Sequence, residues 1–351
     1  MNRTLGTELL IRVGLLVAAL FLFQSNGPRA RAADEMKSEA VETLKAGQKI
    51  GQLTIPEGVV VLPDIAYRKG HERWKLDLAM PVEMGNEPRP GIVFVHGGGW
   101  RGGDKRRANF LGPALDFTAN GYVCISTNYR LLSHAPFPAC VEDVKCAVRW
   151  LRAHANDYNL DPNHIGAYGN SAGAHLVAML GLCPASAGLE GDGPWQEYSS
   201  MVQAVVCSAT PSNFLVPMND RVRPQPPSSG PQERSRGRIG GNFSDEMRKK
   251  MSPITYVSAD APPFMIVHDT SDRTVAVRHG DDLHKALKDA GAKVVTYLRY
   301  DDGYGHGVWG GNAAALGPAR EIFFARHLKK VGQRVSSRPS GRRNTQRQEQ
   351  F

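Results

Sequence analysis

Short apolar runs alternate with longer segments of helical periodicity along most of the chain. Several of these runs are apolar on both faces and bounded by turn residues, a pattern typical of strands in a parallel sheet. The pattern predicts strands over residues 59–68, 74–81, 92–95, 122–129, 164–169, 201–209, 263–269 and 293–300. Apolar positions at helical spacing predict helices over residues 105–120, 138–156, 174–182, 276–290 and 313–330. This alternation predicts an α/β domain with a mostly parallel central sheet and helices on both faces.

The predicted α/β domain spans residues 34–333 and begins with a polar, mildly helical lead-in at 34–55. Residues 211–262 interrupt the alternation of strands and helices with prolines and arginines. We expect such an excursion between core strands to be a cap, a lid or a disordered loop. Residues 334–351 are basic and lack apolar periodicity, which predicts a disordered tail.

The first 33 residues have the layout of a secretory signal peptide. Two arginines precede the apolar run at 13–23, and the small residues within 30–33 form a cleavage signature. We expect cleavage near Ala32 or Ala33 and export to the periplasm or the medium, with no stable membrane insertion afterwards. The alternative is an uncleaved N-terminal anchor, since residues 9–11 extend the apolar run towards the length of a membrane span.

The net charge of +9 at pH 7 comes from three arginine-rich segments, which are the leader, residues 221–240 and the C-terminal tail. The rest of the chain is slightly acidic, so the charge does not indicate a nucleic-acid-binding fold. Either these segments are simply solvated, or they contact an anionic polymer or a membrane surface.

The five cysteines include no C-x-x-C pair, which argues against a thiol-redox motif or a zinc ribbon. Cys124 and Cys207 lie in predicted core strands, where we expect them to be small packed residues. One disulfide among the other three is compatible with export, but the sequence does not pair them. The histidines show no metal-ligand spacing such as H-E-x-x-H, so no metal site is expected.

The sequence AYGNSAGAH at 167–175 places Ser171 between a predicted strand and a predicted helix. Glycines at 169 and 173 remove side chains that would clash across so tight a turn. This G-x-S-x-G context is that of a nucleophile elbow, in which the serine hydroxyl is exposed at the end of a sheet strand. The competing interpretation is a glycine-rich helix start with an N-capping serine.

A serine nucleophile also needs hydrogen-bond donors for the oxyanion that forms when it attacks a carbonyl. HGGGW at 96–100 follows a predicted core strand, and its consecutive glycines let backbone N–H groups face one point. We predict an oxyanion hole made by the N–H groups of Gly98, Gly99 and Ala172. A phosphate cradle is disfavoured, because no Lys-Ser or Lys-Thr follows the glycines and no G-x-G-x-x-G is present.

The required acid and base follow Ser171 in the chain order of α/β hydrolases. Asp269 and Asp272 come at the end of the strand predicted at 263–269, and His306 follows the last predicted strand. Because the carboxyl ends of parallel strands share one edge of a sheet, we expect these side chains near Ser171. The predicted catalytic triad is Ser171, Asp272 and His306.

These motifs resemble those of the α/β-hydrolase esterases of the hormone-sensitive-lipase-like and BD-FAE-like group. The resemblance covers roughly residues 60–330 and rests on HGGGW (96–100), NYRL (128–131), DVKCAVRWLRAHA (143–155), GNSAGAHL (169–176), SPITYVS (252–258), HDTSDRTV (268–275) and GHG (305–307). It implies that Ser171 is acylated, that His306 is the base and that Asp272 orients it, without a metal or organic cofactor.

The chain departs from this family pattern at two places. Asp269 stands where the family usually has glycine, which leaves a second carboxylate as a candidate for orienting His306. We favour Asp272, because it aligns with the motif and has the right offset. The excursion at 211–262 is longer and more basic than the family needs, so the resemblance does not carry over a substrate preference.

Trp100 and Asn170 are the candidate substrate-binding residues, because each neighbours the predicted reacting atoms. Trp100 either lines the acyl pocket or is a packed loop aromatic, and Asn170 either points at the substrate or orients the loop. We expect structural roles for His96, through a backbone hydrogen bond in the glycine loop, and for His175. The pair at 129–130 resembles a family motif that supports the oxyanion loop.

The predicted function is serine carboxylic-ester hydrolysis through an acyl-enzyme, on short-chain esters or on acetyl or feruloyl groups of polysaccharides. Three rivals stand beside it: a peptidase or amidase with the same triad, a non-catalytic binding protein that keeps the fold, and a surface-associated protein that acts through its arginines. The sequence leaves open the acyl and alcohol specificity, the oligomeric state and the order of residues 218–240.

Overall fold

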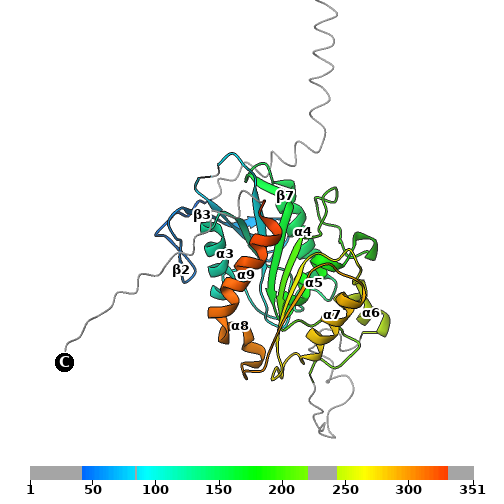
Figure 1. The fold of residues 1–351 in the computed structure, drawn as a ribbon. Coiled ribbons are helices and arrows are strands. Elements are labelled where there is room, and N and C mark those ends of the chain that lie inside the picture. Colours follow the sequence, from blue (N-terminus) through cyan, green and yellow to red (C-terminus); the bar gives the residue numbers. More distant parts are fainter. Residues whose placement is uncertain (1–41, 84, 220–242, 331–351) are drawn as a thin grey trace, which may run out of the picture. The chain divides into compact units, whose positions relative to one another are not determined.

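The computed structural model describes residues 42–83, 85–219 and 243–330. Eight strands within these ranges form one sheet (Figure 1). The strand order is β10-β9-β8-β7-β5-β6-β4-β3. β4 is antiparallel to β3 and β6, whereas the other neighbouring pairs are parallel, which confirms the predicted mostly parallel sheet. The strands are Val59–Ala66 (β3), Lys75–Pro81 (β4), Arg89–Val95 (β5), Val123–Thr127 (β6), Leu160–Asn170 (β7), Ala204–Ser208 (β8), Phe264–Asp269 (β9) and Val295–Tyr300 (β10).

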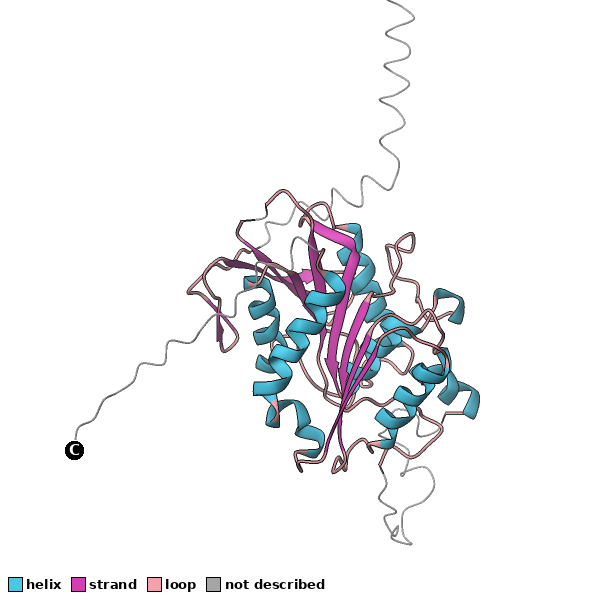
Figure 2. Ribbon diagram, in the orientation of Figure 1, coloured by secondary structure: helices cyan, strands magenta, loops and turns pink. Residues whose placement is uncertain are grey.

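Helices cover both faces of this sheet, as the alternation predicts (Figure 2). They are Ala108–Ala119 (α3), Ala139–Ala153 (α4), Ala172–Leu182 (α5), Asp245–Met251 (α6), Arg278–Asp289 (α7), Val308–Gly311 (α8) and Ala313–Leu328 (α9), with 3₁₀ turns at Ala185–Ala187 (η1), Pro253–Tyr256 (η2) and Gly305–Gly307 (η3). Successive strand residues face opposite layers. Val206 and Met265 belong to the hydrophobic core cluster that contains Phe324 of α9. On the other face of the sheet, Val205 and Phe264 pack against α5.

The helical character expected within residues 34–55 is wrong for the described part of that segment. Lys49–Ile50 (β1) and Leu53–Thr54 (β2) pair as an antiparallel hairpin instead. Gly51 has a φ of +60°, a conformation that glycine adopts without strain and that favours a tight turn over a helix. The weak helical propensity of the polar residues is overridden by this turn and by the pairing of Leu44 with Val61.

The described ends of the excursion at 211–262 pack beside the helix that follows Ser171. His175 of α5 contacts the ring of Phe214 and bonds through Nε2 to the carbonyl of Met251 in α6. Residues 220–242, which include the arginine-rich segment 221–240, lie outside the described residues, as do the predicted signal peptide and the basic tail.

The carboxyl ends of the central strands lie side by side. The register pairs Val95 of β5 with Gly169 of β7, and Tyr300 of β10 with Asp269 of β9. The loops that follow these strands therefore open on one edge of the sheet. They carry the HGGGW motif, Ser171, Asp272 and His306.

Candidate active site

Ser171 occupies a sharp turn between β7 and α5, with a φ of +54° and a ψ of −122°. Such a backbone conformation is strained for a residue with a side chain and is common where function requires it. A Cβ atom at Gly169 would lie 2.4 Å from the carbonyl carbon of Gly173, and one at Gly173 would lie 2.1 Å from the carbonyl oxygen of Val95. Both glycines are therefore needed for the turn to approach its own helix and β5.

The structure brings Ser171, His306 and Asp272 into one hydrogen-bonded chain. Nε2 of His306 is 2.9 Å from Oγ of Ser171, and Nδ1 of His306 is 2.8 Å from Oδ2 of Asp272. This geometry fits an imidazole whose Nδ1–H donates to the carboxylate and whose Nε2 accepts from the serine hydroxyl.

Asp272 is buried, and burial alone would raise the pKa of its carboxyl group. Hydrogen bonds from His268 and His306 lower that pKa well below its usual range, so the group is a carboxylate at neutral pH. Its other oxygen accepts the backbone N–H groups of Thr274 at 2.8 Å and Val275 at 3.0 Å. These bonds fix the direction of the oxygen that faces His306.

The second candidate acid, Asp269, does not face His306. One of its oxygens accepts hydrogen bonds from the backbone N–H of Ser271 at 2.7 Å and from Oγ of Ser271 at 2.6 Å. These bonds lower the pKa of Asp269 against the opposing effect of burial. Asp269 therefore shapes the loop that leads to Asp272, and Asp272 is the carboxylate that contacts the base.

The HGGGW loop lies directly beside the nucleophile. Gly98 and Gly99 have φ values of +126° and +61°, which side chains rarely allow. A Cβ atom at Gly97 would lie 2.8 Å from the carbonyl oxygen of Asn170 and 3.5 Å from Cβ of Ser171. The HGGGW loop therefore runs close to Ser171 at Gly97, and the first N–H of α5, that of Ala172, lacks an intrahelical acceptor.

Residues 76–287 match the model of the BD-FAE family. The chain belongs to the BD-FAE family. The matched residues contain the HGGGW loop, Ser171 and Asp272, whereas His306 lies beyond them. The position of His306 in the site therefore rests on the geometry described above.

Known proteins similar to this BD-FAE chain are described as esterases. Esterase LipC of Mycobacterium tuberculosis is 30% identical over 253 residues, which cover 69% of this chain and 59% of that relative. The chain therefore spans little more than half the length of the curated relative. A truncated carbohydrate esterase from gut microbiota has a TM-score of 0.63 at 27% identity, covering 77% of this chain and 96% of that one. A bifunctional GH43-CE protein of Bacteroides eggerthii has a TM-score of 0.65 at 27% identity, covering 77% and 38%.

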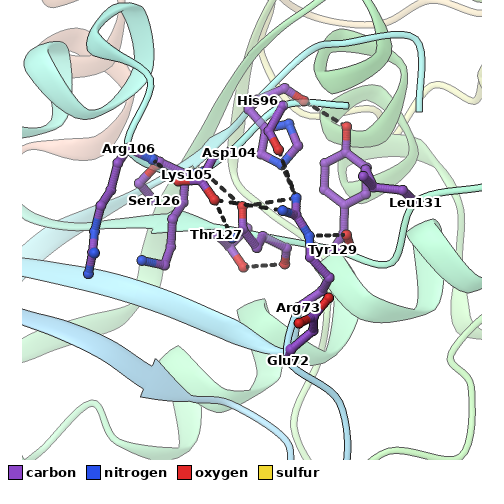
Figure 3. Close-up of polar contacts among 12 residues, drawn as sticks. Glu72, Arg73, His96, Asp104, Lys105, Arg106, Ser126, Thr127, Tyr129 and Leu131 are labelled. Carbon is purple, nitrogen blue, oxygen red and sulfur yellow. Dashed lines mark hydrogen bonds and ion pairs between the residues drawn. The ribbon is translucent and has the colours of Figure 1, made fainter. Parts of the chain in front are cut away.

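In this BD-FAE chain, Tyr129 contacts His96, the first residue of the HGGGW loop (Figure 3). The hydroxyl group of Tyr129 donates to the carbonyl of His96 at 2.9 Å, and the two rings stack at 4.4 Å. Nδ1 of His96 lies 2.9 Å from the carbonyl of Gly97. Burial, with a contribution from Arg73, lowers the pKa of His96 to about 4, so the ring is neutral at pH 7.

Arg73, which sequence reasoning missed, joins three segments behind the same loop (Figure 3). Its guanidinium donates to the carbonyl of Gly103 at 3.0 Å and to that of Tyr129 at 3.3 Å. It also lies 3.2 Å from Nε2 of His96 and 3.2 Å from Oδ1 of Asn128. No periodicity or motif distinguishes Arg73 in the sequence, because its partners come from distant parts of the chain.

The two candidate substrate-binding residues, Trp100 and Asn170, have protein partners of their own. Trp100 is only 7% exposed and donates through Nε1 to Nδ1 of His175 at 3.3 Å. Asn170 donates through Nδ2 to Oγ of Ser208 at 2.9 Å, which ties the end of β7 to β8. Burial lowers the pKa of His175 to about 4, in keeping with its expected structural role.

Within the described residues, no group of three or more His, Cys, Asp or Glu side chains is arranged to hold a metal ion. All five cysteines are free and buried, so the disulfide left open by the sequence is not formed in this structure. Over the same described residues, no helix is long and apolar enough to cross a membrane.

Proposed function

We propose that this BD-FAE-family protein is a serine carboxylic-ester hydrolase. The observation that carries the proposal is the hydrogen-bonded chain from Oγ of Ser171 through His306 to Asp272, at 2.9 Å and 2.8 Å, on a strained turn. A serine hydroxyl is a weak nucleophile, and a base within hydrogen-bond reach that is itself oriented by a carboxylate activates it.

In the proposed mechanism, Nε2 of His306 takes the proton of Ser171 as Oγ attacks the ester carbonyl. Asp272 keeps the proton of Nδ1 in place and stabilises the imidazolium that forms. The oxyanion accepts hydrogen bonds from the N–H groups of Gly98, Gly99 and Ala172. Loss of one such donor typically raises the barrier by about 3 to 4 kcal/mol. His306 then protonates the leaving alcohol, and water repeats the sequence on the acyl-enzyme.

For the substrate, we propose short-chain esters, or acetyl or feruloyl esters of polysaccharides. The names of two structural relatives support this class, since one is described as a carbohydrate esterase and the other as a GH43-CE protein. Trp100 is buried and donates to His175 in the helix that follows Ser171, and it remains the candidate for the acyl pocket. Cleavage of simple aryl esters without any release of acetate from acetylated glycans would contradict this substrate class.

The decisive experiment compares the protein with its Ser171→Ala variant on p-nitrophenyl acetate through p-nitrophenyl octanoate. We expect turnover that disappears in the variant, because Oγ of Ser171 is the nucleophile of the proposed mechanism. Labelling by paraoxon, followed by mass spectrometry, should modify Ser171 and no other serine. A folded protein with neither turnover nor labelling would favour a non-catalytic binding role, and faster hydrolysis of aminoacyl-arylamides would favour an amidase.

We also propose that the protein is exported, on the basis of the leader-like residues 1–33, which lie outside the described residues. N-terminal sequencing of the protein recovered outside the cytoplasm should give a start near Ala33. An intact N-terminus in a membrane fraction would favour the uncleaved anchor.

A further inference from the structure

The segment that carries His306 also carries an exposed aromatic ring. Tyr304 lies two residues before His306, and 53% of its surface is exposed to solvent. Figure 1 shows this segment, between β10 and α8, at the edge where the strands end. Neither the core of the domain nor the proposed acyl transfer needs this ring.

The ring of Tyr304 is fixed against the backbone of α8. A Cβ atom added at Gly311 would lie 2.1 Å from Cγ of Tyr304 and 2.3 and 2.4 Å from its Cδ atoms. The ring therefore rests on Cα of Gly311, in space that only glycine leaves free. This contact covers part of the ring, and about half of the surface of Tyr304 stays exposed.

Two polar side chains, those of Asp302 and Asn312, hydrogen-bond in the same segment as Tyr304. Asp302 accepts hydrogen bonds from the backbone N–H of Tyr304 at 3.5 Å and from Nδ2 of Asn312 at 2.7 Å. Asp302 itself is exposed. The surface next to His306 thus combines a fixed aromatic ring with a carboxylate and an amide, groups that can hydrogen-bond hydroxyl groups of a ligand.

The proposed reaction determines which part of the substrate meets this surface. His306 must give its proton to the leaving alcohol, so the alcohol lies against the histidine when the ester bond breaks. The alcohol of a polysaccharide ester is a sugar, which presents a face of C–H groups and a rim of hydroxyl groups. The negative face of an aromatic ring attracts such C–H groups, and a ring that is already fixed loses little freedom on binding.

We propose that Tyr304 is a stacking platform for a sugar unit of the alcohol part of the substrate, and that Gly311 holds the platform in place. This proposal rests on the proposed ester hydrolysis and assigns the part of the site that distinguishes glycan esters from simple esters. Tyr304 acts here in binding, and the chemistry remains with Ser171 and His306.

The test compares two acetyl esters that differ only in the alcohol, an acetylated xylo-oligosaccharide and p-nitrophenyl acetate. For Tyr304→Ala we expect the ratio of kcat/KM for the glycan ester to that for the aryl ester to fall about five- to tenfold, mainly through KM. Gly311→Ala should lower the same ratio by displacing the ring, and should have no further effect in the Tyr304→Ala background. Tyr304→Trp should keep the ratio, and Tyr198→Ala, at an exposed tyrosine away from the triad, is the matched control.

A fall of equal size on both substrates would show that the ring only supports the His306 segment, and an unchanged ratio would also overturn the platform. A second measurement separates this outcome from failure of the proposed substrate class. Calorimetry should show that xylotetraose binds the Ser171→Ala protein and binds the Ser171→Ala, Tyr304→Ala protein several-fold more weakly. If the enzyme releases no acetate from glycans but this difference holds, the substrate class fails and the platform stands. Absent or equal binding overturns the platform.

Discussion

The two sides of the candidate site are built differently. On the oxyanion side, buried polar groups hold the HGGGW loop from several directions, with Arg73 as their common partner. On the base side, the side chain of His306 is 30% exposed, and its segment is rich in glycine and held by Asp302, Asn312 and the contact of Tyr304 with Gly311.

This difference follows from what each side does in the proposed reaction. Donors for an oxyanion are most effective when they are fixed before the charge develops, because they then need no reorganisation. The base must move a proton from the serine to a departing alcohol, and that alcohol must enter and leave beside it. A rigid buried side and an open side therefore suit the two tasks.

Among the substitutions that leave Ser171 in place, Asp272→Asn should give the largest effect, because it removes the carboxylate that orients the base. An amide at this position favours the wrong imidazole tautomer, so we expect kcat on p-nitrophenyl acetate to fall by about 10⁴ with little change in KM. Asp269→Asn is the matched control, since its carboxylate contacts Ser271 and not His306, and should lower kcat by less than about tenfold. A larger loss in Asp269→Asn than in Asp272→Asn would reverse the assignment of the acid.

Arg73→Ala should give the next largest effect, because it removes the hydrogen bonds that hold the HGGGW loop in place. A displacement of about 1 Å in a catalytic group can cost about 10²-fold in rate, so we expect kcat to fall by about that factor while KM stays within a few-fold. Arg73→Lys should recover part of this loss, since an ammonium group keeps the charge without the planar set of donors. If the two variants lost the same kcat as each other and the same thermal stability as each other, with KM raised in both, Arg73 would serve folding alone.

The grouping of Ser171, Asp272 and His306 at the strand ends could be predicted from the sequence, whereas the residues that support this site could not. Strands buried on both faces are continuous apolar runs, so the ends of β7 and β9 could be placed, whereas the half-exposed β10 was predicted from its own strand-like sequence. Ser171 directly follows β7, and Asp272 and His306 lie in the loops after β9 and β10. Arg73 and the pair of Tyr304 with Gly311 could not be found this way. Each depends on a tertiary contact between residues that share no periodicity, and a glycine that accommodates a ring looks the same as any other glycine in a sequence.

The lead-in hairpin and the two candidate acids illustrate the same limit. The sequence at 49–54 is compatible with a helix as well as with a turn. Only the strand pairing at 49–54 and the pairing of Leu44 with Val61 decide between the two. Offset within a motif favoured Asp272, but Asp269 is the last residue of β9 and lies nearer to the strand end. Only the direction of the carboxylates, one towards His306 and one towards Ser271, separates their roles.

The smallest predicted effect concerns pH and the buried histidines of the rigid side. Burial lowers the pKa of His96 and of His175 to about 4, against an unfolded value near 6.5. A group whose pKa is lower in the folded chain binds fewer protons there, so its contribution to stability is complete above pH 6.5 and is lost as the pH falls towards 4. Each histidine should therefore add about 1.4 kcal/mol per pH unit to the fall in the free energy of unfolding across this window.

Urea denaturation at several pH values between about 7 and about 4.5 measures this slope. His175→Gln should reduce the slope by about one proton, because glutamine does not titrate, even if the variant is less stable throughout. An unaltered slope in His175→Gln would mean that its ring takes up a proton as readily in the folded chain as in the unfolded one. The buried side of the site would then be less closed to water than its hydrogen bonds indicate, and its contrast with the His306 side would weaken.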